Sequence, residues 1–410
     1  MDTTQHRHYM SLALQLAEKG RFSVSPNPCV GCVIVKNNSV VAQGFHQRAG
    51  GAHAEIIALQ AAGVEANGAT AYVTLEPCCH QGKTPPCTNA LIAAGIKKIY
   101  VACVDPNPQI NGAGIAALRL GGIEVEVGLC ATEALQLNEI FFHFIKTKRP
   151  FVIAKWAMSL DGKTQVNAGD HRQISCAESQ RHTHELRQSV DAILVGANTA
   201  MLDNPQLTAR SDQPIHKQPI RIVLAGCDPF PEDLKIFNDG HSSKTFVATT
   251  HSMPPEEPSL PVHPEGSSLP VRPEERFARL EGLVTPSKRA PFETALRASS
   301  GRTDRDDLLV KQAVRNNIEA IVLPKDEFNQ VSLPALLDEL GKRNITSLLV
   351  EGGMRTHESF FRENLIDKIH VYLSPFFIGS SIKQPLNILE FSPKGKDLHL
   401  IANLKEAPHV

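Results

Sequence analysis

The sequence predicts an α/β protein with two domains, and three observations support that prediction. At 410 residues the chain is long for a single domain. Stretches with the apolar pattern of strands alternate with stretches of helical spacing, an order typical of layered α/β folds. Pro150 disfavours helix at the residue before it, ends a long amphipathic stretch and precedes a second series of strands. We therefore expect one domain over 1–149 and another over 150–410.

The first domain alternates helix-like and strand-like stretches. Apolar residues at helical spacing end at Gly20, and an Asn37-Asn38 turn joins two strands in a hairpin. We predict helices around 10–17, at 53–62 and at 88–94, strands at 29–36, 40–46, 69–75, 98–104 and 123–127, and an amphipathic stretch at 131–148.

The second domain repeats the strand–helix alternation, with one interruption. From 251 to 306 the chain is rich in Pro, Glu, Ser and Arg and has little apolar periodicity, which predicts a disordered insertion. Strands are predicted at 151–158, 192–196, 220–224, 244–249, 320–323, 347–350 and 368–373.

Charge and composition exclude several classes of partner. The formal net charge of −1 gives no general attraction to nucleic acid or to anionic membranes. No apolar run approaches the roughly 20 residues that span a bilayer, and residues 1–10 lack the apolar core of a signal peptide. Nine cysteines, several in tight local groups, suit a reducing compartment in which thiols bind a metal. We expect a cytoplasmic protein.

The strongest chemical signal combines His53, Glu55, Cys78 and Cys87. One imidazole and two thiolates supply three ligands of a tetrahedral zinc ion and leave one position for water. Zinc lowers the pKa of that water towards neutrality, and Glu55, two residues from His53, is placed to move protons. This arrangement is the signature of zinc deaminases, in which a shorter Cys-x-x-Cys is usual.

Two features of this pattern leave alternatives. Eight residues separate Cys78 from Cys87, so the intervening loop, which contains Gly and Pro, must fold outwards. Cys79 and His80 could each compete as a ligand, and we favour Cys78 because it directly follows Pro77. A lone cysteine is more often an inert buried thiol. The order of all the residues, in strand and helix context, favours a metal site.

Several strings of the first domain resemble a known enzyme family. They are Pro26-Asn-Pro-Cys-Val-Gly-Cys-Val-Ile-Val35, His53-Ala-Glu55, Thr74-Leu-Glu-Pro-Cys78, Gly82-Lys-Thr-Pro-Pro-Cys87 and Asp105-Pro-Asn-Pro108. Together they resemble the bifunctional diaminohydroxyphosphoribosylaminopyrimidine deaminase/5-amino-6-(5-phosphoribosylamino)uracil reductase family. The spacer before Cys87 is specific to that family among the cytidine-deaminase-like folds.

The resemblance implies a cytidine-deaminase-like three-layer α/β/α domain that binds one Zn²⁺ ion and releases the pyrimidine 2-amino group as ammonia. Lys83 would suit the ribose phosphate, although a lysine in such a loop could equally be a solvated surface residue. Asp105 and Asn107 could likewise only shape a turn. The implied substrate site is lined by Asn27, His46, Lys83, Thr84, Asp105 and Asn107.

The second domain has no Gly-x-Gly-x-x-Gly after a strand, so a Rossmann cofactor site is not supported. Leu348–Met354 instead runs a buried strand into two glycines. These would let a phosphate approach backbone N–H groups, or they form an ordinary strand-to-helix turn. Four strings match the reductase domain of the same family, which resembles dihydrofolate reductase: Lys155-Trp-Ala-Met-Ser-Leu-Asp-Gly162, Asp203-Asn-Pro-Gln-Leu-Thr208, Glu351-Gly-Gly353 and Ser374-Pro375 through Gly379.

The resemblance implies an NADPH-dependent reduction, with Lys155 and Asp203 as the candidates that polarise and protonate the sugar. The implied substrate residues are Arg187, Leu207 and Arg210, whose two guanidinium groups could hold a phosphate bidentately. Each charged residue could instead be a surface group or half of a structural ion pair. The implied cofactor residues are Ala157, His171, Gln173, Thr199, Asp203, Glu351, Gly352 and Gly353.

One string departs from the family pattern. Gly169-Asp-His-Arg-Gln-Ile-Ser175 stands where members commonly have Gly-Glu-Ser-Gln-Trp-Ile-Thr. His171 and Gln173 thus replace a Ser and a Trp near the cofactor, and Arg172 could compensate by meeting its 2′-phosphate.

Two other functions are weighed against the bifunctional enzyme. A deaminase of RNA or free nucleosides would have a basic face and a short Cys-x-x-Cys, and the sequence offers neither. A non-catalytic C-terminal domain is favoured only by the altered 169–175 string and the insertion. We therefore predict both reactions on a small pyrimidine ribosyl phosphate and, by analogy, a homo-oligomer.

Overall fold

The computed structural model describes residues 3–80, 85–164, 174–212, 215, 217–225, 231, 233–240, 244–250, 318–375, 377–378, 387–394 and 397–403. The insertion predicted over 251–306 lies outside these described residues. Within the described part of the chain, no helix is long and apolar enough to cross a membrane.

The N-terminal half contains a five-stranded sheet in the order β2-β1-β3-β4-β5. β1 pairs antiparallel with β2 and β3, whereas β3, β4 and β5 run parallel. Parallel neighbours need crossover connections, and α3 and α4 supply them. The elements are α1 (Thr3–Glu18), β1 (Gly31–Lys36), β2 (Ser39–Phe45), α2 (Ala54–Ala62), β3 (Thr70–Val73), α3 (Cys87–Ala93), β4 (Lys98–Val101), α4 (Ala113–Leu120), β5 (Glu124–Val127), α5 (Ala131–Leu137) and α6 (Glu139–Thr147).

Helices cover both faces of this sheet, so the half has three layers. One face packs against α2, α3 and α4 through a core that includes Ala58, Leu91 and Leu118. The other face packs against α1 and α5 through Met10 and Ala134. Successive residues of each strand point to opposite faces, so one apolar strand can serve both cores. These layers agree with the predicted α/β/α arrangement.

The C-terminal half contains a seven-stranded sheet in the order β10-β9-β8-β7-β11-β6-β12, and all its pairings are parallel. Its elements are β6 (Phe151–Ser159), α7 (Ala177–Ser189), β7 (Ala192–Gly196), α8 (Ala197–Asp203), β8 (Ile220–Leu224), α9 (Lys235–Asn238), β9 (Thr245–Thr249), β10 (Glu319–Val322), α11 (Leu333–Lys342), β11 (Ser347–Val350), α12 (Met354–Arg362) and β12 (Lys368–Ser374).

This sheet is also buried on both faces. α7, α8 and α9 pack on one face through Leu186, Ala200 and Ile236. α11 and α12 pack on the other face through Leu336 and Phe360. Burial on both faces explains why its strands are nearly continuous apolar runs in the sequence.

The predicted elements agree closely with the structure, with two differences. The amphipathic stretch predicted over 131–148 is two helices, because Asn138 separates α5 from α6. The Asn138 side chain bonds to the backbone of a distant residue, Cys29. It accepts the Cys29 N–H at 2.8 Å and donates to the Cys29 carbonyl at 2.9 Å. α4 and the hairpin of β13 (Asn387–Lys394) and β14 (Asp397–Asn403) lie outside the predicted elements.

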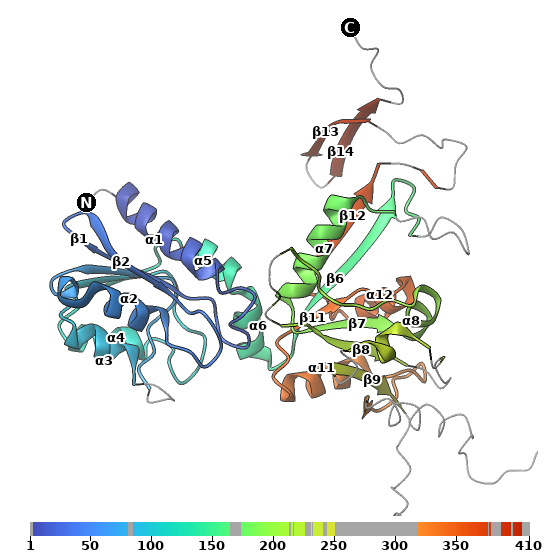
Figure 1. The fold of residues 1–410 in the computed structure, drawn as a ribbon, viewed down its shortest axis with the longest axis horizontal. Coiled ribbons are helices and arrows are strands. Elements are labelled where there is room, and N and C mark those ends of the chain that lie inside the picture. Colours follow the sequence, from blue (N-terminus) through green and yellow to red (C-terminus); the bar gives the residue numbers. More distant parts are fainter. Residues whose placement is uncertain are drawn as a thin grey trace, which may run out of the picture.

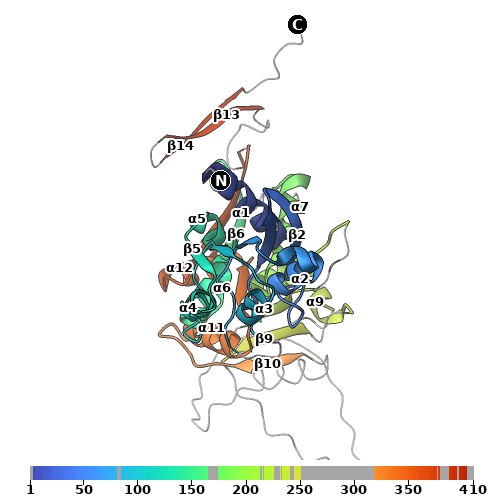
Figure 2. The same ribbon diagram turned by 90° about the vertical axis from the view of Figure 1, so that its left-hand side faces the viewer.

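The two halves meet through α6 and a few polar contacts. Figure 1 shows α6 between the two sheets, and the view in Figure 2 agrees that the β13–β14 hairpin lies away from both. Residues 148–150 connect α6 to β6. The contacts between the halves include Glu139–Lys368 at 2.5 Å, Arg149–Asp338 at 2.6 and 3.0 Å, and Ser25–Asp191 at 2.6 Å.

Candidate active sites

Three ligand-type side chains converge in the N-terminal half. The Nδ1 atom of His53 lies 3.1 Å from the Cys87 sulfur and 3.5 Å from the Cys78 sulfur. All three atoms lie within 4.8 Å of one another, and Cys79 and His80 are not part of this group. A hydrogen bond from Cys87 holds the pKa of the Cys78 thiol well below its usual range, which favours the thiolate that binds metals. One imidazole and two sulfurs fit three ligands of a tetrahedral zinc ion.

Local structure explains this convergence. His53 directly precedes α2, Cys78 follows β3, and Cys87 begins α3, with its N–H 3.3 Å from the Cys78 sulfur. The His53 side chain makes no capping bond to its own helix, so it faces the thiols. α2 packs closely on β2 at Gly44, where a Cβ atom would lie 2.4 Å from the Ala54 carbonyl oxygen. A larger residue at 44 would push α2 and its ligand away.

Glu55 lies in the first turn of α2 and is only 3% exposed. Burial raises the pKa of its carboxyl to about 7, and the carboxyl also contacts the Cys87 thiol. A carboxyl with a pKa near neutrality can both accept and return a proton, which is what a general acid–base requires.

Asn27 and His46 form a pair beside the three ligands. Nδ1 of His46 lies 3.0 Å from the Ala52 carbonyl, which can only accept, so this nitrogen donates. Burial lowers the pKa of His46, so its ring is neutral and Nε2 accepts from the Asn27 amide at 3.0 Å. The side-chain carbonyl oxygen of Asn27 accepts no hydrogen bond from the described residues, so it remains for another donor. The His46 ring meets the His53 ring edge-on, with 5.7 Å between centroids.

The other predicted substrate residues of this half are placed differently. Asp105 is buried, and burial raises the pKa of its carboxyl to about 6. Its Oδ1 accepts the Asn107 N–H at 2.8 Å, so both residues do shape a turn. Lys83 and Thr84 lie outside the described residues.

Glu76 organises this turn, although sequence reasoning did not single it out. Its carboxylate is 4% exposed and accepts four backbone N–H groups. Oε2 takes those of Asp105 and Gly112 at 3.1 and 2.9 Å, and Oε1 takes those of Gly114 and Ile115 at 2.8 and 3.2 Å. Glu76 thus ties the strand that leads to Cys78 to the Asp105 turn. Its place just before Pro-Cys was the available signal.

A buried ion pair dominates the centre of the C-terminal half. Arg187 donates from Nε and Nη2 to the two Glu351 oxygens, at 2.7 and 2.9 Å. The implied role of Arg187 in holding a phosphate with Arg210 stays a prediction, and in the structure its Nε and Nη2 atoms hold Glu351. The reason is electrostatic, because a buried carboxylate without a partner would be very unfavourable.

Lys155 lies beside this pair. β6 and β11 run parallel with Ala154 opposite Val350, which brings Lys155 next to Glu351. Burial lowers the pKa of the Lys155 ammonium, and its Nζ lies 5.3 Å from the centre of the Tyr372 ring.

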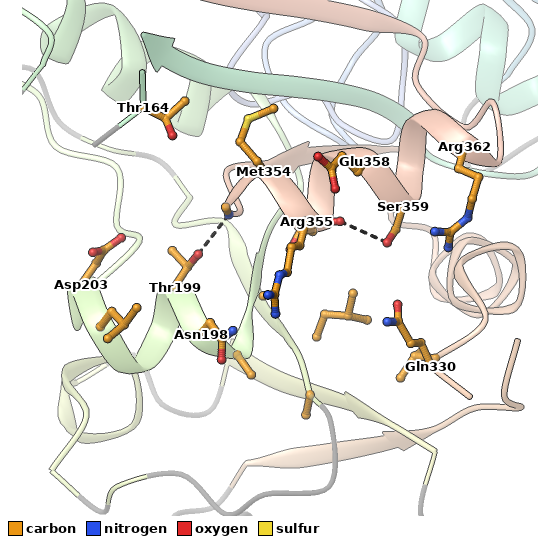
Figure 3. A pocket seen from close by; sticks show the side chains of 18 of the residues that line it. Thr164, Asn198, Thr199, Asp203, Gln330, Met354, Arg355, Glu358, Ser359 and Arg362 are labelled. Carbon is orange, nitrogen blue, oxygen red and sulfur yellow. Dashed lines mark hydrogen bonds between the residues drawn. The ribbon is translucent and has the colours of Figure 1, made fainter. Parts of the chain in front are cut away.

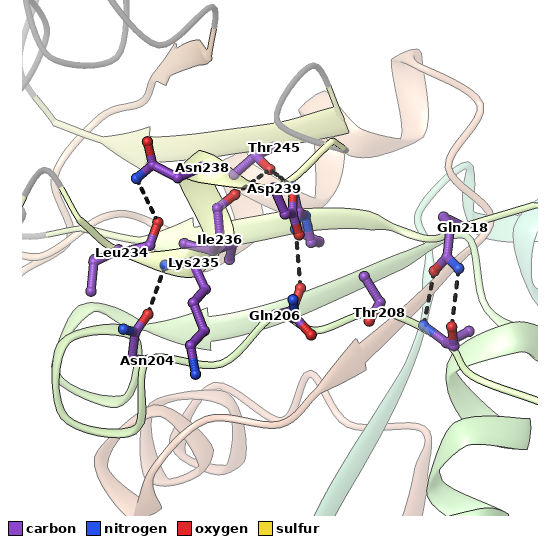
Figure 4. Close-up of polar contacts among 12 residues, drawn as sticks. Asn204, Gln206, Thr208, Gln218, Leu234, Lys235, Ile236, Asn238, Asp239 and Thr245 are labelled. Atoms are coloured by element: carbon purple, nitrogen blue, oxygen red, sulfur yellow. Dashed lines mark hydrogen bonds and ion pairs between the residues drawn. The ribbon is translucent and has the colours of Figure 1, made fainter.

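The segment 204–210 is anchored by polar contacts to neighbouring elements (Figure 4). Arg221, 1% exposed, donates to the Gln206 carbonyl at 3.1 Å and to Asp239 at 2.6 Å. Leu207 is 3% exposed and its side chain belongs to the core, so only its backbone can meet a ligand. Arg210 is exposed and bonds to Gln206 at 2.5 Å.

A cavity of about 810 Å³ opens at the carboxyl ends of the parallel strands. The carboxyl-end crevice is where open α/β sheets bind ligands. Figure 3 shows Thr199 of α8 bonded to the backbone at the start of α12, where the Gly353 N–H donates to the Thr199 hydroxyl at 3.0 Å. Three predicted cofactor residues, Thr199, Asp203 and Gly353, line the cavity.

The remaining predicted cofactor residues are not in this lining. Ala157, Glu351 and Gly352 are described but lie outside the residues that line the cavity. His171 and Gln173 are outside the described residues. Sequence reasoning missed Arg355 and Arg362, two basic side chains of α12 that line the cavity (Figure 3). In the sequence, the only feature that marks these two arginines is their helical spacing after the two glycines, which is a weak indication of a binding site.

Comparison with known proteins assigns the two halves of the chain to different family models. The family model "RibD C-terminal domain" matches residues 150–280 and 283–402, and "Cytidine and deoxycytidylate deaminase zinc-binding region" matches 3–103. The riboflavin biosynthesis protein RibD of Aquifex aeolicus is 37% identical over 376 residues, covering 92% of this chain and 88% of that protein. RibD of Escherichia coli is 35% identical over 390 residues, covering 92% and 90%.

The chain belongs to the RibD family. A solved structure of Acinetobacter baumannii RibD, 30% identical, superposes with a TM-score of 0.72 and covers 98% of this chain and all of that one. A Thermotoga maritima structure described as the deaminase/reductase, 29% identical, has a TM-score of 0.69 and covers 97% and 98%. As a RibD family member, the protein is a bifunctional enzyme of riboflavin biosynthesis that deaminates and then reduces. The two alternative functions weighed above are therefore set aside.

Glu76→Gln tests the scaffold of the N-terminal site. The new amide would point N–H groups at backbone N–H donors, so we expect the free energy of unfolding to fall by roughly 1–3 kcal/mol. Urea denaturation of the zinc-loaded protein measures this. The control is Glu124→Gln, whose exposed carboxylate pairs with Lys98 at 2.6 Å, and which should change stability by less than about 0.5 kcal/mol. Equal effects of both substitutions would contradict the role of Glu76.

Proposed function

We propose that residues 1–149 deaminate 2,5-diamino-6-ribosylamino-4(3H)-pyrimidinone 5′-phosphate and that residues 150–410 then reduce its ribosyl group with NADPH. The observation that carries this proposal is the convergence of His53, Cys78 and Cys87 beside the buried Glu55, in a chain of the RibD family. The product would be 5-amino-6-ribitylamino-uracil 5′-phosphate.

In the deaminase half, His53, Cys78 and Cys87 would hold one Zn²⁺ ion. When bound, this ion lowers the pKa of a water in its open position and so supplies a nucleophile at neutral pH. Glu55 takes a proton from the attacking water and passes it to the amino group, which leaves as ammonia. Asn27, whose side-chain carbonyl oxygen accepts no hydrogen bond from the described residues, binds the pyrimidine.

The rest of the deaminase site would orient the substrate. His46 holds the Asn27 amide, and Asp105 and Asn107, which are joined in one turn, would line the same site. Lys83 and Thr84 are proposed to meet the ribose phosphate, for which an ammonium is a suitable partner.

In the reductase half, the 810 Å³ cavity would receive NADPH, which supplies a hydride for C1′ of the sugar. Thr199, Asp203 and Gly353 would contact this cofactor, together with Ala157, His171, Gln173, Glu351 and Gly352 near its reactive end. Lys155 and Asp203 would polarise and protonate the sugar while C1′ receives the hydride. The position of Lys155 beside the Arg187–Glu351 pair supports its role as proton donor. The proposed substrate contacts are Arg187, Arg210 and the Leu207 backbone.

Glu55→Gln should separate the two activities. The amide cannot carry the proton, so ammonia release should fall by about 10²–10⁴-fold, the usual contribution of a general acid–base. Zinc content, measured by mass spectrometry, and reduction of the pre-deaminated substrate should be unchanged. Glu65→Gln, an exposed glutamate of the same half, is the matched control. Equal loss of both activities would contradict separate sites.

The pH dependence of reduction tests Lys155. Burial lowers its pKa, so the protonated, proton-donating form is present at low pH and is lost as pH rises through that lowered value. We expect kcat/KM for NADPH oxidation to fall with rising pH, with its midpoint below the ordinary lysine value of about 10.4. Lys155→Arg, which stays charged, should abolish this decline. An identical decline in the variant would show that another group titrates.

A further inference from the structure

The two halves of the chain share one buried carboxylate, that of Asp191, which is 4% exposed. It directly precedes β7 and divides its oxygens between two partners in the C-terminal half and one in the N-terminal half. Oδ2 accepts the Thr346 N–H at 2.8 Å and its hydroxyl at 2.7 Å. Oδ1 accepts from Lys217 at 3.0 Å and from the Ser25 hydroxyl at 2.6 Å. The Ser25 contact therefore joins the reductase sheet to the deaminase half.

Ser25 belongs to the turn that carries Asn27. The N–H of Asn27 donates to the Val24 carbonyl at 2.8 Å, which closes the turn. A shift of Ser25 would therefore also shift Asn27. The Asn27 amide reaches Nε2 of His46 at 3.0 Å, and the His46 ring contacts the ring of His53. A continuous series of contacts thus leads from Asp191 to the proposed zinc ligands.

We propose that Asp191 is a positioning residue for deamination, which acts across the boundary between the halves by fixing Ser25 and thereby Asn27. The proposal rests on the proposed function, in which Asn27 binds the pyrimidine. The 2.6 Å contact has the length of a charge-assisted hydrogen bond, which is stronger than a neutral one.

Because of this contact, the C-terminal half helps to position a substrate-binding turn of the N-terminal half. The carboxylate accepts two hydrogen bonds from Thr346, which directly precedes β11, so its position depends on the reductase sheet. The deaminase turn then takes its position from that sheet. If the interface served stability alone, loss of the Ser25–Asp191 bond would not alter the position of Asn27.

Ser25→Ala in the full-length protein is the direct test, because it removes the bond and leaves the Asp191–Thr346 contacts. We expect the KM of deamination to rise about tenfold, as for loss of one hydrogen bond to a charged group. The kcat of deamination, zinc content and NADPH-dependent reduction should change less than about twofold. Amide hydrogen exchange over residues 23–29 should become faster.

Two further variants sharpen the comparison. Ser189→Ala is the matched control, because its hydroxyl lies two residues from Asp191 but bonds to Leu186 within α7. It should leave deamination unchanged. Asp191→Asn should raise the KM of deamination in the wild-type background, and add little when Ser25→Ala is already present, as expected for two residues that act through one contact.

The outcomes distinguish this proposal from the proposed function. An unchanged KM in Ser25→Ala overturns the positioning role, as does a parallel loss of thermal stability and of both activities, which indicates a merely structural contact. Wild-type protein that releases no ammonia from the pyrimidine substrate would instead refute the proposed function before any variant is compared.

Discussion

The parallel pairing of the central strands is the constraint on which both sites depend. Parallel strands end at the same edge of a sheet, so residues that follow different strands meet there. In the N-terminal half, Cys78 follows β3 and Asp105 follows β4. In the C-terminal half, Thr199 follows β7 and Glu351 follows β11. Residues that are far apart in sequence therefore form sites without any long loop to hold them.

Within these sites, burial acts on two glutamates in opposite ways. Glu55 forms no ion pair with any described residue, and burial raises its pKa to about 7, so it can exchange protons near neutrality. Glu351 is also buried, but its bidentate bond to Arg187 holds the pKa of its carboxyl below the usual range. The cationic groups around Glu351, above all the Arg187 guanidinium, keep its carboxylate charged. Glu55 lacks such an ion pair among the described residues, so its carboxyl can exchange protons. That difference fits a hydrolytic site and a cofactor-dependent site respectively.

Sequence patterns predicted the sheet strands well, because burial on two faces leaves uninterrupted apolar runs. The bounds 192–196, 220–224 and 347–350 agree with the structure. The zinc-type residues were also predictable, since their spacing is specific. Contacts between distant residues were not predictable, since nothing local to Arg187 indicates that it pairs with Glu351. The place of Glu76 before Pro-Cys is visible in the sequence, but the distant N–H groups that it accepts are not. The break at Asn138 depends likewise on its distant partner, Cys29.

In this protein one chain carries two successive reactions in separate sites. The most direct measurement follows ammonia release and NADPH oxidation in parallel on the purified protein, with 2,5-diamino-6-ribosylamino-4(3H)-pyrimidinone 5′-phosphate as substrate, before and after removal of zinc by a chelator. We predict ammonia release that requires zinc, followed by stoichiometric NADPH oxidation, and undiminished oxidation by chelated protein that receives the deaminated intermediate. Folded, zinc-loaded protein that releases ammonia without oxidising NADPH, or does neither, would contradict the account.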